Sequence, residues 1–473
     1  MASSSFDLIF LVVMLLSPFM AVAQTNGSGP VGASITATDD SPSCGFLLLL
    51  PFSTDGQAYK NVSLGSSLTA ASGDIPWTSP SGDFAFGFQQ VGDTGYLLAI
   101  WFNKIPERTI VWSANRNKLA PRGSTVQLTA DGLLVLNDQS GRRIWTKPEL
   151  GGSGAAYGAM LDTGNFVLAG QAGANLWQSF DEPTDTLLPT QNLKSGAQLI
   201  APYLEKNYSD GRFMLILQGD GNLVMYTTSY PLNTSNFAYW STQSSIGYQL
   251  IFNQSGYMYL VASNGTILNR VFSNSVPLQD LYLRATIDYD GVFRQYVYPK
   301  TASRGKGWAM AWTTLPNFVP PNICMAINNG VGSGACGLNS YCKLGDDQRP
   351  SCSCPPGYTF SDQDDERKGC KKIFISQDCD HPSQEIDSFE IRDMLNTDFP
   401  RTDYDFFGSV DEDWCRQSCL SDCYCDVAIF NAGRCYKKRG PLLNGVIDPS
   451  IGDKALMKES TCSLLDGTDK NKR

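Results

Sequence analysis

The stretch that decides the fold is Asp162-Thr163-Gly164-Asn165-Phe166-Val167-Leu168, in which a glycine turn leads into a short apolar strand. Trp177 follows its glycine by 13 residues, and Trp145 follows the first glycine of a similar stretch, Asp131-Gly132-Leu133-Leu134-Val135-Leu136, by the same 13. Trp112 precedes both, so the three tryptophans fall 33 and 32 residues apart. This repetition predicts one supersecondary unit used three times about an axis, with the three indoles at the centre.

Looser copies of the turn continue along the chain. They are Gly219-Asp220-Gly221-Asn222-Leu223-Val224, Gln254-Ser255-Gly256-Tyr257-Met258-Tyr259 and Tyr289-Asp290-Gly291-Val292-Phe293. Strand-like apolar runs separated by glycine turns fill the region, and none shows a sustained helical period. We therefore predict two tandem all-β domains, at residues 61–172 and 173–305.

The composition excludes several classes of protein. The 473 residues carry 36 Lys and Arg against 46 Asp and Glu, which gives a net charge of −10 and a pI of 4.8. This acidic balance, without a basic run, argues against nucleic acid or an anionic membrane as partner. The single histidine, His381, is followed by Pro382 and Ser383. A Ser-His-Asp triad, a His-rich zinc site and a kinase His-Arg-Asp loop are therefore excluded.

The start of the chain predicts secretion. Leu8 to Leu16 is an apolar run and Ala21-Val22-Ala23 an A-x-A cleavage site, so residues 1–23 read as a signal peptide. The run is shorter than the about 20 apolar residues of a transmembrane helix. Residues 24–60 contain a near-copy of the sequence that follows, so we interpret this leader as a duplication. We expect it to be poorly ordered, and we expect Cys44 to have no dedicated disulfide partner. Asn-x-Ser/Thr sequons also predict an extracellular glycoprotein; they lie at Asn26, Asn61, Asn207, Asn233, Asn253 and Asn264.

Two stretches carry a resemblance to a known family. They are Val111-Trp112-Ser113-Ala114-Asn115-Arg116 and Trp177-Gln178-Ser179-Phe180-Asp181-Glu182-Pro183-Thr184-Asp185-Thr186-Leu187-Leu188-Pro189. Both resemble hallmark stretches of plant bulb-type (G-type) lectin, S-locus-like ectodomains. The resemblance implies a β-prism II fold, in which three four-stranded sheets surround a pseudo-threefold axis. The expected fold class is therefore all-β, with a bulb-type lectin domain, a second lectin-like domain of S-locus type, and disulfide-rich modules after them.

A candidate sugar site lies at residues 218–226. The pattern Gln218-x-Asp220-x-Asn222-x-Val224-x-Tyr226 matches the mannose-binding pattern of the bulb-type lectins. A straight strand would spread it over roughly 26 Å, several times a hexose, whereas a turn at Asp-Gly-Asn brings Gln218 and Tyr226 onto neighbouring strands. Asp220 would accept hydrogen bonds from the sugar, Gln218, Asn222 and Tyr226 would donate and accept, and Val224 would offer an apolar patch. The scheme needs no metal or cofactor.

A structural interpretation of the same turn remains open. Asp220-Gly221-Asn222 can serve only to make the hairpin, as the related turns at residues 131 and 162 must. Those copies are degenerate, because Leu133 replaces the asparagine of the first and Asp162 and Asn165 stand three apart in the second. A single site should bind weakly, since millimolar affinity corresponds to about −4 kcal/mol, and avidity would need clustering.

Of the 14 cysteines, 13 lie between Cys324 and Cys462. The first six allow many connectivities. Together with a Cys-x-Cys-Pro-Pro-Gly-Tyr run they resemble an EGF-like module at residues 320–371. The resemblance implies the pairs Cys324–Cys342, Cys336–Cys352 and Cys354–Cys370. Residues 317–323 contain no Asp or Glu, so we expect no bound calcium.

The remaining cysteines are similar in spacing to a PAN/apple module, at residues 379–462. Its core is Trp414-Cys415-x-x-x-Cys419-Leu420-x-x-Cys423-x-Cys425, and the resemblance implies the pairs Cys415–Cys435 and Cys419–Cys425. Cys379 is left with Cys423 or Cys462, and the odd cysteine permits an intermolecular disulfide and a homodimer. Zinc is the competing interpretation, but the cluster lacks two Cys-x-x-Cys knuckles and an oxidising compartment favours disulfides.

These features predict a secreted recognition protein with the layout of a lectin receptor-like kinase ectodomain. The expected partners are glycans or glycoproteins and, through the PAN module, a peptide or receptor. Family members of this layout commonly continue into a transmembrane helix and a Ser/Thr kinase; residues 463–473 are instead a polar tail, so we expect neither a membrane span nor enzyme activity here. The alternative is a non-lectin glycoprotein of S-locus type, a soluble decoy or co-receptor. A glycosidase would need two paired carboxylates, and nothing singles out a pair among the 46 acids.

Overall fold

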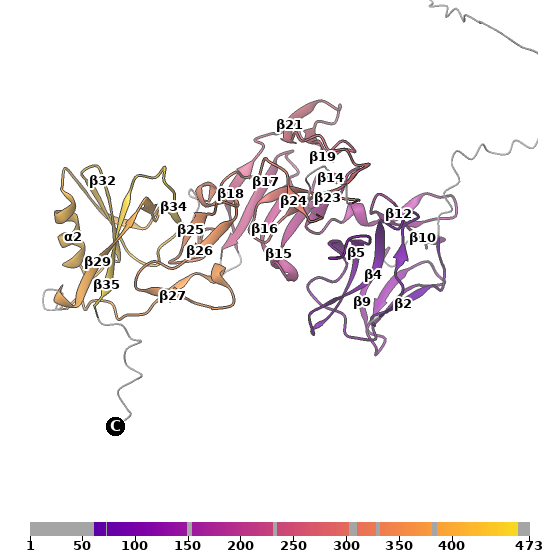
Figure 1. The fold of residues 1–473 in the computed structure, drawn as a ribbon, viewed down its shortest axis with the longest axis horizontal. Coiled ribbons are helices and arrows are strands. Elements are labelled where there is room, and N and C mark those ends of the chain that lie inside the picture. The colour runs from indigo at the N-terminus through magenta and orange to yellow at the C-terminus, as the bar shows by residue number, and fades with distance from the viewer. Residues whose placement is uncertain are drawn as a thin grey trace, which may run out of the picture. The chain divides into compact units, whose positions relative to one another are not determined.

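A computed structural model describes residues 61–71, 73–148, 154–229, 234–301, 310–327, 332–380 and 386–461 (Figure 1). The predicted signal peptide, the leader at 24–60 with Cys44, the sequons at Asn26 and Asn233, His381, Cys462 and the tail at 463–473 lie outside the described residues. The described part consists mainly of strands and turns, with the short helices α1 (Ile323–Ala326) and α2 (Glu412–Leu420). The all-β prediction is confirmed.

Three four-stranded antiparallel sheets form a first prism, coloured indigo to purple in Figure 1. The sheets are β2 (Ser67–Thr69), β7 (Thr125–Leu128), β8 (Leu134–Asn137) and β9 (Arg143–Lys147); β3 (Trp77–Thr78), β4 (Phe84–Val91), β5 (Gly95–Phe102) and β6 (Ile110–Ser113); and β1 (Val62–Ser63), β10 (Tyr157–Met160), β11 (Phe166–Ala169) and β12 (Asn175–Gln178). Their inner faces bury large apolar side chains, among them Phe86, Leu98, Leu136 and Phe166. This is the β-prism II arrangement that the resemblance implies.

Three tryptophans meet inside this prism, as the repeat spacing predicts. Trp112, Trp145 and Trp177 come from β6, β9 and β12, the last strand of each sheet, and their ring centroids lie 5.7–6.0 Å apart in edge-to-face contact. The indole N–H groups of Trp112 and Trp177 donate to the backbone carbonyl and the carboxylate of Glu182, at 2.8 and 3.1 Å. Lys147 pairs with the same carboxylate at 2.6 Å. One glutamate thus satisfies two indole donors at the centre of the prism.

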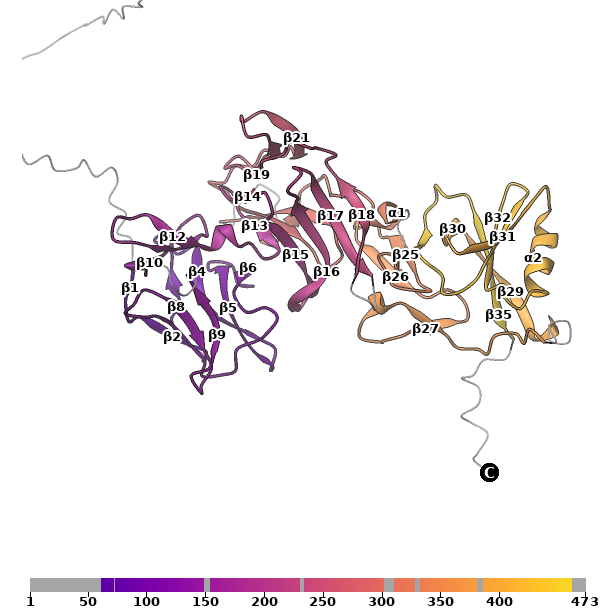
Figure 2. The ribbon, with the colours of Figure 1, turned by 180° about the vertical axis from the view of Figure 1, so that it is seen from behind.

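A second set of three four-stranded sheets follows, in magenta and pink in Figure 2. The sheets are β13 (Thr186–Leu187), β22 (Leu281–Ile287), β23 (Phe293–Pro299) and β24 (Thr313–Thr314); β14 (Asn192–Lys194), β19 (Gln249–Phe252), β20 (Met258–Val261) and β21 (Ile267–Phe272); and β15 (Gln198–Leu204), β16 (Asn207–Leu217), β17 (Leu223–Ser229) and β18 (Thr234–Ser241). Phe213, Phe252, Met258 and Phe293 fill its core. Of the described residues that pack in this core, Trp240 of β18 is the one tryptophan, so the even tryptophan spacing does not continue after residue 177.

The boundary between the prisms differs from the predicted one at residue 172. β12 pairs with β11 and completes the third sheet of the first prism, so that prism extends to Gln178. β24 pairs with β23, which carries the second prism past residue 305. Apolar runs and glycine turns mark single strands but do not show which sheet a strand joins, because pairing between distant strands decides that.

The two hallmark stretches connect the prisms. The Arg116 guanidinium donates from Nε to the carbonyl of Tyr208 at 2.6 Å and from Nη1 to that of Ile200 at 3.0 Å, both in the second prism. It also lies 3.9 Å from the carboxylate of Asp185. Burial raises the pKa of the Asp185 carboxyl, and the Arg116 charge opposes that rise. The tryptophans of the two stretches therefore lie in the core of the first prism, and Arg116 connects that prism to the second.

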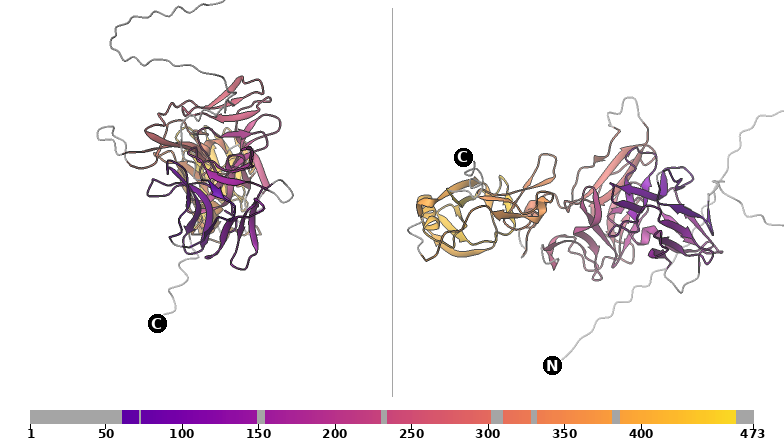
Figure 3. Two further views of the ribbon diagram at one scale, coloured as in Figure 1. Left: turned by 90° about the vertical axis from the view of Figure 1, so that its right-hand side faces the viewer. Right: turned by 90° about the horizontal axis from the view of Figure 1, so that it is seen from below.

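The cysteine-rich part, orange and yellow in Figure 3, holds six disulfides. They join Cys324–Cys342, Cys336–Cys352, Cys354–Cys370, Cys379–Cys423, Cys415–Cys435 and Cys419–Cys425. Of the two partners left open for Cys379, the structure has Cys423. The helix α2 packs through Cys415 and Cys419 on a five-stranded sheet of β29 (Phe389–Leu395), β35 (Lys454–Ser460), β32 (Val427–Asn431), β33 (Arg434–Lys438) and β31 (Asp403–Gly408).

A further sheet crosses the predicted division between the two cysteine-rich modules. It contains β26 (Pro350–Ser353), β25 (Tyr341–Leu344), β34 (Gly445–Ile447) and β30 (Thr397–Asp398). β25 runs parallel to β34, with Cys342 opposite Val446. A hairpin of β27 (Tyr358–Phe360) and β28 (Cys370–Lys372) lies in the same region. The segments at 320–371 and 379–462 thus share a sheet, which cysteine spacing alone does not show.

Replacing Gly132 by alanine should destabilise the protein more than the same change at Gly141. Both have positive φ, 77° and 81°, so the backbone strain is common to both. A Cβ on Gly132 would stand 2.2 Å from the Ala155 nitrogen, whereas one on Gly141 meets nothing within 4 Å. We expect Gly132→Ala to cost about 1–3 kcal/mol more of the free energy of unfolding, measured by urea denaturation. Equal losses in the two variants would contradict this packing role.

Candidate carbohydrate-binding site

Residues 218–226 form a hairpin that connects β16 to β17 in the second prism. Leu217 pairs with Leu223 at its base. The Gln218 nitrogen donates to the Asn222 carbonyl at 2.9 Å, and the Gly221 nitrogen donates back to the Gln218 carbonyl at 3.0 Å. The motif therefore folds back on itself instead of running along one straight strand.

Four polar side chains of the motif lie on this hairpin, and two of them, Gln218 and Tyr226, are in direct contact. Gln218 Nε2 donates to the Tyr226 hydroxyl at 2.9 Å, and Asp220 Oδ1 accepts from the Asn222 backbone N–H at 2.9 Å. Asn222 Oδ1 accepts from the Thr242 hydroxyl at 3.1 Å. Asp220 is exposed, while Gln218, Asn222 and Tyr226 are half-buried. Each has more hydrogen-bonding atoms than these contacts use, so the group can still engage hydroxyls from solvent.

Val224 differs from its expected role as an open apolar patch. Its side chain is 1% exposed. β17 lies between β16 and β18, and Val224 stands opposite Ile216 on one side and Ser241 on the other. Cross-strand neighbours cover a short side chain on a central strand. The position of β17 within its sheet, which the sequence does not reveal, explains this burial.

The same backbone turn recurs in eight described hairpins of the two prisms. In each, the first residue donates its N–H to the carbonyl of the fifth, and the glycine at the fourth position donates back to the first. Three of these hairpins join the third and fourth strands of a sheet and begin at Asp138, Gly170 and Ala262; the other five join the second and third strands and begin at Thr129, Leu161, Gln218, Asn253 and Asp288. Among the eight, the one at Gln218 alone carries the full set of Gln, Asp, Asn, Val and Tyr. The turn itself is therefore a structural device of the fold, and the side chains at 218–226 are not needed to make it.

The last of these hairpins binds the protein's own arginines. At the positions equivalent to Gln218, Asp220, Val224 and Tyr226 it has Asp288, Asp290, Arg294 and Tyr296. Arg294, 1% exposed, donates to both carboxylates at 2.7 Å. Arg349 of the cysteine-rich part donates to the Tyr296 hydroxyl at 3.1 Å and lies 3.4 Å from Asp290. Burial, followed by the charge of Asp290, raises the pKa of Asp288. This copy thus anchors the cysteine-rich part to the second prism.

Four of the predicted glycosylation sites lie in the described residues. Asn61, Asn207 and Asn264 are exposed and Asn253 is half-buried. In the last three the side-chain oxygen accepts the backbone N–H two residues further on. This bond leaves the amide nitrogen, the atom that a glycan would join, outside the contact. Asn207 is the first residue of β16, the strand that leads into the 218–226 hairpin.

Within the described ranges, no three His, Cys, Asp or Glu side chains gather closely enough to hold a metal ion. No helix in that same part of the chain has the length and apolar character needed to cross a membrane.

A family model described as D-mannose binding lectin matches residues 109–199. This range runs from β6 into β15 and includes both hallmark stretches. It ends before residue 218, so the match supports the lectin fold and does not bear on the candidate sugar site.

The chain is also similar to receptor-like kinases of plants. It is 42% identical over 428 residues to the G-type lectin S-receptor-like serine/threonine-protein kinase LECRK3 of Oryza sativa subsp. indica, which covers 87% of this chain and 52% of that protein. It is 33% identical over 503 residues to RLK1 of Arabidopsis thaliana, which covers 98% of this chain and 54% of that protein. The chain therefore spans about half the length of the curated relatives it matches.

Solved lectin structures match a smaller part of the chain. Colocasia esculenta agglutinin with mannose bound is 23% identical, with 27% of this chain and 98% of that chain covered and a TM-score of 0.18. Polygonatum cyrtonema lectin complexed with monomannoside is 19% identical, with 26% and 99% covered and a TM-score of 0.19.

Asp220→Ala and Asp290→Ala, at equivalent positions of two hairpins, should differ widely in cost. Asp220 is exposed and accepts one backbone N–H, so we expect a loss of about 1 kcal/mol. Asp290 neutralises the buried Arg294, so its removal should cost about 3 kcal/mol or more. Chemical denaturation of both variants measures the difference. Similar costs would show that the last hairpin does not depend on its buried ion pairs.

Proposed function

Because the chain is a homologue of the G-type lectin S-receptor-like kinase family, we propose that it binds mannose-type glycans outside the cell through the hairpin at residues 218–226. Its role is recognition, as in the ligand-sensing ectodomain of a lectin receptor-like kinase. Its partners are glycans or glycoproteins, and the proposal involves no catalytic step and no metal.

One observation carries the proposal. Of eight hairpins with the same backbone turn, the hairpin at Gln218 alone carries the four polar side chains of the motif, although the turn forms without them elsewhere. Thr129 and Leu133 make the equivalent turn in the first prism without any such set. Vicinal sugar hydroxyls both donate and accept, and they match the mixture of carboxylate, carboxamide and phenol at 218–226. Sugar recognition accounts for these side chains, and hairpin formation alone does not.

The burial of Val224 changes how such a site would contact a sugar. We assign the apolar contact to the half-buried ring of Tyr226, because Val224 is only 1% exposed. The bond from Gln218 to the Tyr226 hydroxyl holds that ring in place. A hexose would then lie against Tyr226 and donate to Asp220, with Asn222 at its other side. So few contacts predict millimolar affinity, about −4 kcal/mol, and clustering would be needed for biological avidity.

Asp220→Ala should reduce binding of mannose and high-mannose glycans at least tenfold while the melting temperature changes little. The carboxylate accepts from the sugar, and its one structural bond is at an exposed turn. Asn222→Ala should act in the same direction. Binding is measured by glycan array and titration after enzymatic trimming of the protein's own glycans.

Asp131→Ala is the matched control, because Asp131 is exposed at the equivalent place of the first-prism hairpin. It should leave binding unchanged. Asp220→Asn keeps the side-chain oxygen that accepts from the Asn222 backbone N–H, but it removes the second carboxylate oxygen and the charge. Loss of glycan binding in this variant would therefore come from the contact with the sugar and not from a weakened turn. Undiminished glycan binding in both Asp220 variants would refute the assignment to this hairpin.

A second candidate function is recognition of a protein or peptide by the last sheet. β31 is an edge strand of that sheet. Its Phe406 is 54% exposed, and Trp414 on the neighbouring helix α2 is 41% exposed. Exposed aromatic side chains beside an open strand edge suit the addition of a peptide strand. Loss of biological activity on Trp414→Ala or Phe406→Ala, with Asp220→Ala silent, would favour this function over glycan binding.

A further inference from the structure

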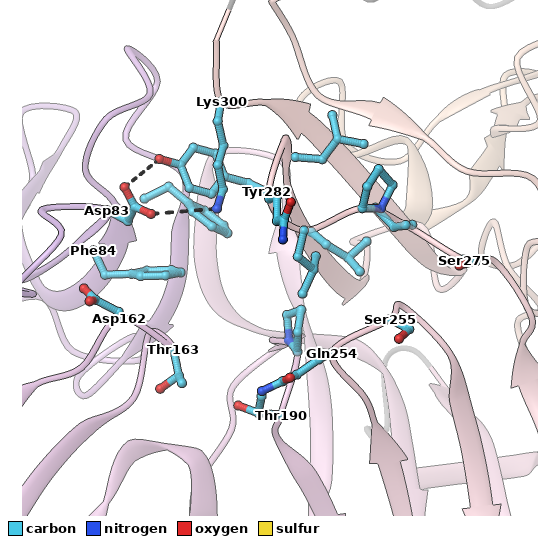
Figure 4. Close-up of a pocket in the computed structure, with 18 residues that line it drawn as sticks. Asp83, Phe84, Asp162, Thr163, Thr190, Gln254, Ser255, Ser275, Tyr282 and Lys300 are labelled. Atoms are coloured by element: carbon cyan, nitrogen blue, oxygen red, sulfur yellow. Dashed lines mark hydrogen bonds and ion pairs between the residues drawn. The ribbon is translucent and has the colours of Figure 1, made fainter. Parts of the chain in front are cut away.

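A pocket of about 800 Å³ opens between the two prisms, away from the hairpin at 218–226 (Figure 4). Phe84 and Phe102 of the first prism and Tyr282 of the second line its wall. The Tyr282 hydroxyl donates to Asp83 at 2.9 Å, which joins the prisms across the pocket. This volume lies in the range of about 300–1,000 Å³ that is typical of small-molecule sites.

The exposed side chains that line this pocket are mostly uncharged hydrogen-bonding groups. They are Thr163, Thr190, Gln254, Ser255, Ser275 and Gln279. In Figure 4, Asp162 and Thr163 of the first prism lie across the opening from Thr190 and Gln254 of the second. The aromatic rings beneath are largely buried, with Phe84 and Tyr282 both 6% exposed. An apolar ligand would leave the hydroxyl and carboxamide groups without partners, which is costly.

The charges at the pocket are largely neutralised within the protein. Asp83 pairs with Lys104 at 2.7 Å and lies 4.0 Å from Lys300. Asp162 Oδ1 accepts from the backbone N–H and the hydroxyl of Ser81, at 2.8 and 2.6 Å. Burial works against ionisation of Asp162, but these Ser81 bonds hold its pKa below the usual range. The carboxylate is therefore ionised at neutral pH and would repel an anion, whereas its Oδ2 can accept from a hydroxyl.

We propose that this pocket is a second binding site, separate from the 218–226 hairpin, for a neutral sugar unit of an oligosaccharide. A sugar unit would lie above the largely buried Phe84 and Tyr282, with its hydroxyls directed to Asp162, Thr163 and Gln254. The occupant is recognised by its hydroxyl groups and its lack of charge. A chain with this site and the hairpin would hold one branched glycan at two places, or two glycans at once.

The sugar can come from two sources. One is an oligosaccharide from outside. The other is the protein's own glycan, because Gln254 and Ser255 of the pocket belong to the sequon that begins at Asn253. Asn253 Oδ1 is bound to the backbone N–H groups of Ser255 and Tyr257, at 2.9 and 3.0 Å. The attachment point is thus fixed beside the pocket.

The test fills the pocket with a bulky side chain. Ser275→Trp is compared with Ser273→Trp, because Ser273 is also exposed but does not line the pocket. Both are made in the Asp220→Ala background, so the hairpin site does not contribute. Mannopentaose, cellopentaose and chitopentaose are titrated against each protein by ligand-observed NMR, before and after enzymatic trimming and in an Asn253→Gln variant. Melting temperatures show that each variant is folded.

We expect at least one of these probes to bind the Asp220→Ala protein and to lose tenfold or more of its affinity in Ser275→Trp but not in Ser273→Trp. Binding that appears only after trimming or in Asn253→Gln identifies the protein's own glycan as the resident sugar. Absence of binding in all forms, or equal binding by the two tryptophan variants, overturns the proposal. The hairpin is tested independently by comparing the Asp220 variants in the Ser275→Trp background, where the pocket is filled, so the two sites can fail separately.

Discussion

The packing of three indoles about one axis is the constraint on which the first prism depends. Trp112, Trp145 and Trp177 meet with ring centroids 5.7–6.0 Å apart, and each comes from the last strand of a different sheet. Edge-to-face packing at this distance tolerates little change in where those strands stand. The even spacing along the chain follows from that requirement. Glu182 binds two of the indoles from the segment that leads into the second prism, so this segment is fixed to the core of the first prism.

A common backbone turn then supports different uses. Eight described hairpins share the same pair of backbone hydrogen bonds, and their side chains are free to differ. One presents polar groups at 218–226, and another holds Arg294 and Arg349. Two more contribute Thr163 and Gln254 to the pocket between the prisms. The fold therefore fixes where side chains point, and the residue at each place decides what they bind.

The cysteine-rich part depends on contacts as well as on disulfides. Arg212 of the second prism donates to the carbonyls of Arg367 and Gly334, each at 2.8 Å, and the Tyr203 hydroxyl donates to Asp365. The parallel pairing of β25 with β34 binds the two halves of this part to one another. Disulfides restrict the unfolded chain, while these bonds decide how the folded segments meet. The spacing of the cysteines predicts the disulfides, but it does not predict the hydrogen bonds and strand pairing through which the folded segments meet.

The sequence by itself determined the all-β class, the threefold repeat and the meeting of Trp112, Trp145 and Trp177, because these follow from local turns and regular spacing. It also marked 218–226 by its full set of residues. Only the tertiary structure decided that Val224 is buried on a central strand, that β12 belongs to the first prism, and that Asp162 and Gln254 border one pocket. Each of these depends on which distant strands lie side by side. Neighbours along the chain carry the local signals, but pairing between strands far apart in sequence is settled only when the whole chain packs.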